Sequence, residues 1–88
     1  MSFQILLKSS VRSDIKGLGK SKFGQIFGKA FQFLMTRPED GKPLTGNFSG
    51  YYSLRVGDYR VIYIIRGETV IIARIGHRSD AYKKSIEE

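Results

Sequence analysis

Three β-rich runs, separated by two glycine–acid pairs, constrain the fold of this chain more than any other feature. Residues 51–56, 59–65 and 69–75 are rich in Tyr, Val and Ile, which favour strands. The pairs Gly57-Asp58 and Gly67-Glu68 lie between the runs. Glycine in the first central position of a two-residue loop is typical of a type II′ turn. The sequence therefore predicts two tight hairpins and a three-stranded antiparallel meander.

A two-residue turn at Gly57-Asp58 fixes the register of the first hairpin by antiparallel counting. The opposite pairs are Val56 with Tyr59, Arg55 with Arg60, and Leu54 with Val61. Like charges directly opposite each other destabilise a sheet, and a bound anion would relieve the repulsion between Arg55 and Arg60. Both arginines can equally be ordinary surface charges, paired with Asp58 or Asp80.

The same register sorts the meander into two faces. The face predicted to receive the helices is apolar and carries Tyr52, Leu54, Val56, Tyr59, Val61, Tyr63 and Ile65. The other face carries the arginines with Tyr51, Ser53, Ile62 and Ile64. We expect this second face to be half covered by a terminal helix and half open as a basic groove.

The first half of the chain predicts a strand followed by two helices. Residues 3–8 have a period close to two, and Ser9 or Ser10 offers an N-cap for a short helix that ends at Gly17–Gly19. A second helix is predicted from the helical spacing of Phe23, Ile26, Phe27, Ala30, Phe31 and Leu34. Aromatic residues at this spacing are usually core, so we assign them no function.

Residues 37–50 hold two prolines, three glycines and no periodicity, which predicts a loop of 14 residues with Lys42 as a candidate contact residue. Asp80 to Glu88 are expected to form a short terminal helix. The predicted fold class is α+β in the order strand, helix, helix, three-stranded antiparallel meander and helix, with the helices on one face of the sheet. At this length we expect a single domain over residues 1–88.

Charge and composition narrow the classes of function. Fifteen Lys and Arg against eight Asp and Glu give a net charge of +7, which favours nucleic acid or an acidic protein as partner. With no cysteine and one histidine, the chain offers no thiol nucleophile and no two-histidine metal site. No window approaches the roughly 20 apolar residues that span a bilayer, so we expect a cytoplasmic protein with no membrane partner.

A histidine, an arginine and a tyrosine follow the last strand within six residues. Cleavage of RNA by its own 2′-hydroxyl needs a proton acceptor, a proton donor and positive charge on the phosphorane. His77 could act as acid or base, since an unperturbed histidine has a pKa of about 6.5. Arg60 and Arg78 could hold the phosphate in bidentate fashion, and Tyr82 could stack on a base or transfer a proton. Each also has a plain structural interpretation as a helix cap, a surface charge or a packed ring.

Three ordered segments resemble the RelE branch of the RelE/ParE toxins. They are Lys42-Pro43-Leu44-Thr45-Gly46, then Tyr52-Ser53-Leu54-Arg55-Val56-Gly57-Asp58-Tyr59-Arg60-Val61-Ile62-Tyr63, then Ile75-Gly76-His77-Arg78 with Tyr82. The resemblance implies an mRNA interferase, an endoribonuclease that enters the ribosomal A site and cuts the exposed codon without metal or other cofactor.

The resemblance also implies roles for single residues. Arg60 and Arg78 would stabilise the phosphate in the transition state, and Tyr82 would orient or activate the attacking hydroxyl or stack on a base. The residues expected to bind RNA are Arg55, Lys42 and Tyr51.

The sequence departs from the family pattern at two places. Tyr51 and Ser53 stand where well-studied members carry paired lysines, which leaves the general base open. His77 stands where some relatives have Lys, so it either takes over proton transfer or shapes the end of the strand.

The resemblance implies a RelB-like antitoxin as partner, whose acidic or amphipathic segment blocks the basic face, with operator DNA reached only through that complex. Two alternatives remain: a ParE-like inhibitor that binds DNA gyrase, and a catalytically silent homologue that acts as a co-repressor with its antitoxin.

Overall fold

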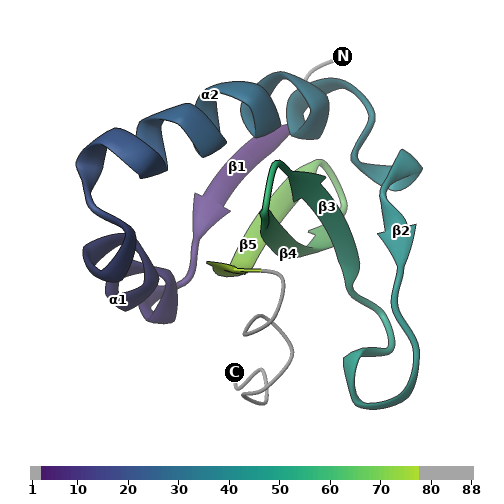
Figure 1. Ribbon diagram of the computed structural model, residues 1–88. Helices are drawn as coiled ribbons and strands as arrows, with labels where there is room; N and C mark the ends of the chain where they lie inside the picture. Colours follow the sequence, from purple (N-terminus) through teal and green to yellow (C-terminus); the bar gives the residue numbers. More distant parts are fainter. Residues whose placement is uncertain (1–2, 78–88) are drawn as a thin grey trace.

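The structure is a computed structural model that describes residues 3–77, and these residues form two helices packed on one face of a mixed sheet (Figure 1). The helices are α1 (Ser9–Leu18) and α2 (Lys20–Thr36). The strands are β1 (Gln4–Leu7), β2 (Lys42–Pro43), β3 (Tyr52–Val56), β4 (Tyr59–Arg66) and β5 (Thr69–His77). Two 3₁₀ turns, η1 (Pro38–Asp40) and η2 (Gly46–Phe48), complete the described elements.

The five strands follow the order β1-β5-β4-β3-β2, with β1 parallel to β5 and every other pair antiparallel. The predicted α+β class and the meander of β3, β4 and β5 are therefore confirmed. The terminal helix expected at residues 80–88 lies outside the described residues, as do Arg78 and Tyr82.

Both hairpin turns have the predicted geometry. Gly57 and Gly67 adopt φ of 60° and 59°, and no described non-glycine residue has a positive φ. A positive φ at the first central position alone is the signature of a type II′ turn. The predicted register is also confirmed, since β3 and β4 pair Val56 with Tyr59, Arg55 with Arg60 and Leu54 with Val61.

The core forms where the helices meet the predicted apolar face of the meander. Its buried side chains are Val11, Ile26, Ala30 and Leu34 from the helices and Val61, Tyr63, Val70, Ile72 and Ile75 from the sheet. The remaining residues predicted for that face, such as Leu54 and Ile65, pack against this core while partly buried.

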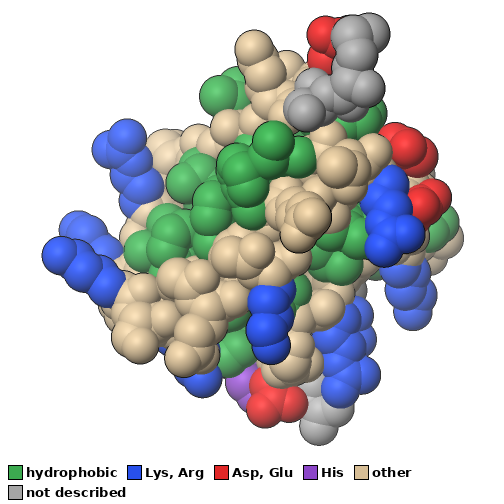
Figure 2. Space-filling model, turned by 90° about the horizontal axis from the view of Figure 1, so that it is seen from above, with side chains coloured by type: hydrophobic (Ala, Val, Ile, Leu, Met, Phe, Trp, Pro, Cys, Tyr) green, Lys and Arg blue, Asp and Glu red, His purple; other side chains and the backbone are tan. Residues whose placement is uncertain are grey.

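The aromatic stripe of α2 is only partly core, which corrects the sequence interpretation. Phe23, Phe27 and Phe31 follow one another along the helix with ring centroids 5.2 and 5.1 Å apart, and Phe31 is 38% exposed. They lie about 60° around the helix from the buried line of Ile26, Ala30 and Leu34, because a shift of three residues falls one sixth of a turn short of a full turn. From the α2 side, apolar side chains remain visible between projecting Lys and Arg side chains (Figure 2).

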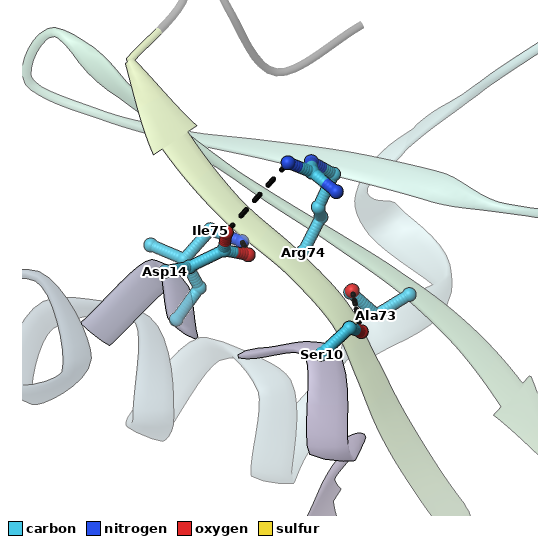
Figure 3. Close-up of polar contacts among 5 residues, drawn as sticks. All are labelled: Ser10, Asp14, Ala73, Arg74 and Ile75. Atoms are coloured by element: carbon cyan, nitrogen blue, oxygen red, sulfur yellow. Dashed lines mark hydrogen bonds and ion pairs between the residues drawn. The ribbon is translucent and has the colours of Figure 1, made fainter. Parts of the chain in front are cut away.

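Helix α1 contacts β5 just beyond the last residue that pairs with β1, Ile72, and Figure 3 shows Ser10 and Asp14 of the helix directed at this part of the strand. The Ser10 hydroxyl donates to the carbonyl of Ala73 at 3.3 Å, and the amide of Ile75 donates to the Asp14 carboxylate at 3.1 Å. Arg74 lies 3.6 Å from the same carboxylate. The predicted serine N-cap is wrong: the N-cap residue is Lys8, which makes no capping bond with its side chain, because Ser10 already lies in the first turn and faces β5.

The prediction that residues 37–50 form a loop without regular structure is also wrong. Lys42 and Pro43 pair with Ser53 and Tyr52 as strand β2, and η1 and η2 occupy much of the rest. The pattern hid this strand because it is only two residues long and contains a proline, which is tolerated at the edge of a sheet.

We predict that Asp14→Ala lowers the free energy of unfolding by about 1–3 kcal/mol, because the amide of Ile75 loses its acceptor in a partly buried place. Urea titration followed by circular dichroism measures the change. Lys16→Ala, at an exposed position of the same helix, is the matched control and should stay within about 0.5 kcal/mol of wild type. Equal midpoints for the two variants would contradict the edge-capping role.

Candidate functional site

The sheet face opposite the helices gathers three of the predicted contact residues. Arg55 and Arg60 are directly paired across β3 and β4, and Lys42 is paired with Ser53 across β2 and β3. Directly paired residues project from the same face of an antiparallel sheet. Nη1 of Arg60 lies 3.5 Å from the Ser53 hydroxyl oxygen, a long hydrogen bond that tilts the guanidinium towards β3 and β2.

Lys42 and Arg60 line one hollow of about 390 Å³. Its other lining residues are Pro43, Leu44, Thr45 and Phe48. The lining therefore combines two cations with apolar walls and one aromatic ring, and it includes no acidic residue. Cations of this kind neutralise phosphate, and an aromatic ring offers a surface on which a base can stack.

Sequence reasoning missed Phe48. It is a half-buried aromatic residue in η2, inside the segment that the sequence presented as an irregular loop. The only signal in the sequence was a single large aromatic side chain among glycine, asparagine and serine. Its place beside Lys42 and Arg60 depends on tertiary structure.

The two paired arginines differ in exposure. Arg55 is exposed, and its Nε donates to the carbonyl of Gly57 at 3.1 Å, which holds the side chain along its own turn. Arg60 is half-buried in the middle of the face. A half-buried guanidinium is already partly desolvated and oriented, so it suits close contact with a phosphate better than the solvated Arg55 does.

The buried hydroxyl of Tyr63 fixes the segment that carries Lys42. It donates to the carbonyl of Pro38 in η1 at 2.6 Å, and the Tyr63 ring stacks on the Tyr52 ring with the two centroids 5.6 Å apart. Burial raises the pKa of Tyr63 well above its ordinary value, so the hydroxyl stays protonated and remains a donor at neutral pH. A Cβ atom on Gly41 would overlap this hydroxyl, which explains the glycine just before β2.

The structure does not bring every candidate residue to the same place. Tyr51 is half-buried and lines a second hollow, separate from that of Lys42 and Arg60. His77 is exposed at the end of β5 and directly paired with Tyr59, with the two rings edge to face at 5.6 Å. Because Tyr59 packs against the core on the helix side, His77 projects from the face opposite Arg60.

Other kinds of site find little support within residues 3–77. No three His, Asp or Glu side chains of this part of the chain lie together as metal ligands. Neither described helix is long and apolar enough to cross a membrane.

Comparison with known proteins gives consistent relatives. The family described as ParE toxin of type II toxin–antitoxin system, parDE, matches residues 5–82. Toxin RelG of Mycobacterium tuberculosis is 33% identical over 87 residues, covering 96% of this chain and all of the relative. Toxin RelE of the same organism is 30% identical over 84 residues, covering 92% of this chain and 87% of the relative.

A solved structure agrees with these sequence matches. The toxin–antitoxin complex RelBE2 of M. tuberculosis contains a chain that superposes with a TM-score of 0.70 at 29% identity. The match covers 89% of this chain and 100% of that chain.

We predict that Gly41→Ala and Tyr63→Phe each lower the free energy of unfolding. The first variant forces η1 away from the Tyr63 hydroxyl, and the second leaves the buried Pro38 carbonyl without its donor, at a cost of about 1–3 kcal/mol. Gly28→Ala is the matched control, because a Cβ there meets nothing within 4 Å and alanine favours a helix by up to about 1 kcal/mol. Chemical denaturation should show that Gly41→Ala lowers the free energy of unfolding and that Gly28→Ala raises it. A change of the same sign in both variants would contradict the role of the Tyr63–Pro38 hydrogen bond in holding η1.

Proposed function

This chain belongs to the RelE/ParE superfamily of toxins from type II toxin–antitoxin systems, and from that premise we propose that it is a ribosome-dependent mRNA endoribonuclease. It would cleave translated messages in the cytoplasm until a cognate antitoxin neutralises it. The observation that carries this proposal is the hollow in which Lys42 and Arg60 converge beside Phe48. Two relatives that are at least 30% identical bear the names toxin RelG and toxin RelE.

The proposed reaction uses the RNA's own nucleophile. The 2′-hydroxyl oxygen forms a bond to the adjacent phosphorus, and the bond from phosphorus to the 5′-oxygen breaks. A base takes the proton of the 2′-hydroxyl, and an acid returns a proton to the leaving 5′-oxygen. The phosphorane between these steps carries extra negative charge, which fixed guanidinium groups stabilise.

Each candidate residue except Tyr51, which lies in the other hollow, takes a defined part in this proposal. Arg60 contacts the phosphorane together with Arg78, and Tyr82 orients or activates the attacking hydroxyl. Lys42 and Arg55 bind the flanking backbone phosphates. His77 receives a positioning role at the end of β5, since it projects from the face opposite Arg60.

A RelB-like antitoxin is the proposed partner. The similar M. tuberculosis structure is a toxin–antitoxin complex. A net charge of +7 favours an acidic or amphipathic antitoxin segment that covers the basic face and thereby excludes RNA. Operator DNA would be contacted only through the toxin–antitoxin complex.

Inhibition of DNA gyrase is the second candidate function. It is favoured by the description of the matching family as ParE toxin. It is also favoured by Tyr51 and Ser53, which stand where well-studied members of the RelE branch carry paired lysines. Under this alternative the basic face would bind a protein and cut no RNA. A silent homologue acting as co-repressor is the third possibility.

Induction of the chain in bacteria without antitoxin separates these functions. We expect growth arrest together with new 5′ ends inside translated codons of an abundant message, read by primer extension. Arrest with intact mRNA and broken DNA would transfer the assignment to gyrase inhibition. Unimpaired growth would indicate a silent homologue.

We predict that Arg60→Ala and Arg78→Ala each abolish growth arrest and message cleavage, because each removes positive charge that would stabilise the phosphorane. Arg12→Ala, at an exposed position of α1, is the matched control and should leave both readouts unchanged. Circular dichroism of the purified variants verifies that they fold. Full toxicity in folded Arg60→Ala would contradict the assignment of the hollow.

A further inference from the structure

A second hollow lies on the sheet face opposite the helices, the basic face that carries Arg55 and Arg60. It is near Arg66, at the other end of β4 from Arg60. It has a volume of about 300 Å³ and is lined by Lys8, Tyr51, Ile64, Arg66 and Ile71. These residues come from the junction of β1 with α1, the position just before β3, and strands β4 and β5. The hollow shares no lining residue with the one formed by Lys42 and Arg60.

The floor of this second hollow is apolar, although it belongs to the sheet face that no described helix covers. Ile64 and Ile71 are directly paired across β4 and β5, and both are partly exposed. Leu6, paired with Ile71 on β1, is 55% exposed. A sheet face open to solvent normally carries polar residues, so the exposed Leu6 and the partly exposed Ile64 and Ile71 form an unusual apolar patch on this face.

Two cations and one aromatic ring surround this apolar floor. Lys8 is held in place through its backbone amide, which donates to the carbonyl of Ile72 at 3.0 Å. Arg66 ends β4, and Tyr51 is tied to the neighbouring segment by the bond from the amide of Leu44 to its carbonyl at 2.9 Å. The lining contains no acidic residue. Cations around an apolar floor with a ring at its side fit a nucleotide, which presents a phosphate and a flat base.

The two hollows lie at opposite ends of strand β4. Arg60 and Arg66 are both on β4, six residues apart and on the same face, which at the rise of a strand is about 20 Å. A single RNA strand that follows β4 would therefore contact both hollows, with several nucleotides between the phosphate at Arg60 and the one at Arg66.

We propose that the hollow of Lys8, Tyr51 and Arg66 is a second RNA subsite, which binds a nucleotide several positions from the cleaved bond. Tyr51 stacks on the base, while Lys8 and Arg66 neutralise its phosphates. This subsite rests on the proposed function and extends it, because it makes the chain bind a length of single-stranded RNA and not one phosphate alone.

The test measures binding and not cleavage. The probe is a single-stranded RNA of about 12 nucleotides with 2′-O-methyl groups, which cannot be cut, and fluorescence anisotropy reports its affinity for the full chain. We expect the double variant Lys8→Gln/Arg66→Gln to bind at least about tenfold more weakly than wild type. The slope of log affinity against log salt should also become shallower by about 0.7 for each phosphate that the variant no longer neutralises.

The matched control is Lys16→Gln/Lys20→Gln, which removes the same charge from exposed positions on the helices. It should change the affinity less than about twofold. Tyr51→Leu should weaken binding by about tenfold and Tyr51→Phe should not, because phenylalanine keeps the stacking surface.

The outcomes separate this subsite from the proposed function. Weaker RNA binding by the hollow variants supports the subsite even if the wild-type chain leaves translated messages intact. Equal weakening in the hollow and control variants, or no binding by wild type, would overturn the subsite while message cleavage in cells could still stand. Weakened antitoxin binding with unchanged RNA affinity would assign the hollow to an acidic protein segment and also overturn it.

Discussion

The alternation of side chains across the hairpin of β3 and β4 is the constraint on which the rest of this structure depends. Gly57 sets a two-residue turn, and the turn sets a register in which apolar side chains meet the helices while Arg55 and Arg60 project from the other face. A slip of one residue would exchange the two faces. The core and the candidate recognition face thus depend on the same register, with the core on one side and the cations on the other.

Two sets of side-chain hydrogen bonds extend the sheet where strand pairing ends. Asp14 and Ser10 bond backbone groups of β5 beyond the last residue paired with β1, and the Tyr63 hydroxyl, on the helix side of the meander, bonds the Pro38 carbonyl of η1. Both contacts hold segments that carry candidate site residues. The first holds the strand that leads towards Arg78, and the second holds the approach to β2, from which Lys42 projects.

The basic face combines features that a purely structural sheet would avoid. Arg55 faces Arg60 directly, and aliphatic side chains such as Ile64 and Ile71 are partly exposed. Opposed like charges destabilise a sheet, and exposed aliphatic groups forgo the benefit of burial. Such violations of local rules concentrate at functional sites. A polyanion with flat apolar bases would satisfy both at once, which is why the proposed ligand is RNA and not a small anion.

The sequence by itself determined the meander, its turns, its register and the sorting of its two faces, because each follows from contacts between residues close in the chain. It also determined that Arg60 and Lys42 were candidate contacts, through charge and family resemblance. Tertiary structure alone decided that Lys42 lies on a strand and that Phe48 lines the same hollow. It also decided that Phe31 is exposed and that His77 projects from the face opposite Arg60. These features depend on contacts such as that of Tyr63 with Pro38, between residues 25 positions apart, and no local periodicity encodes such a contact.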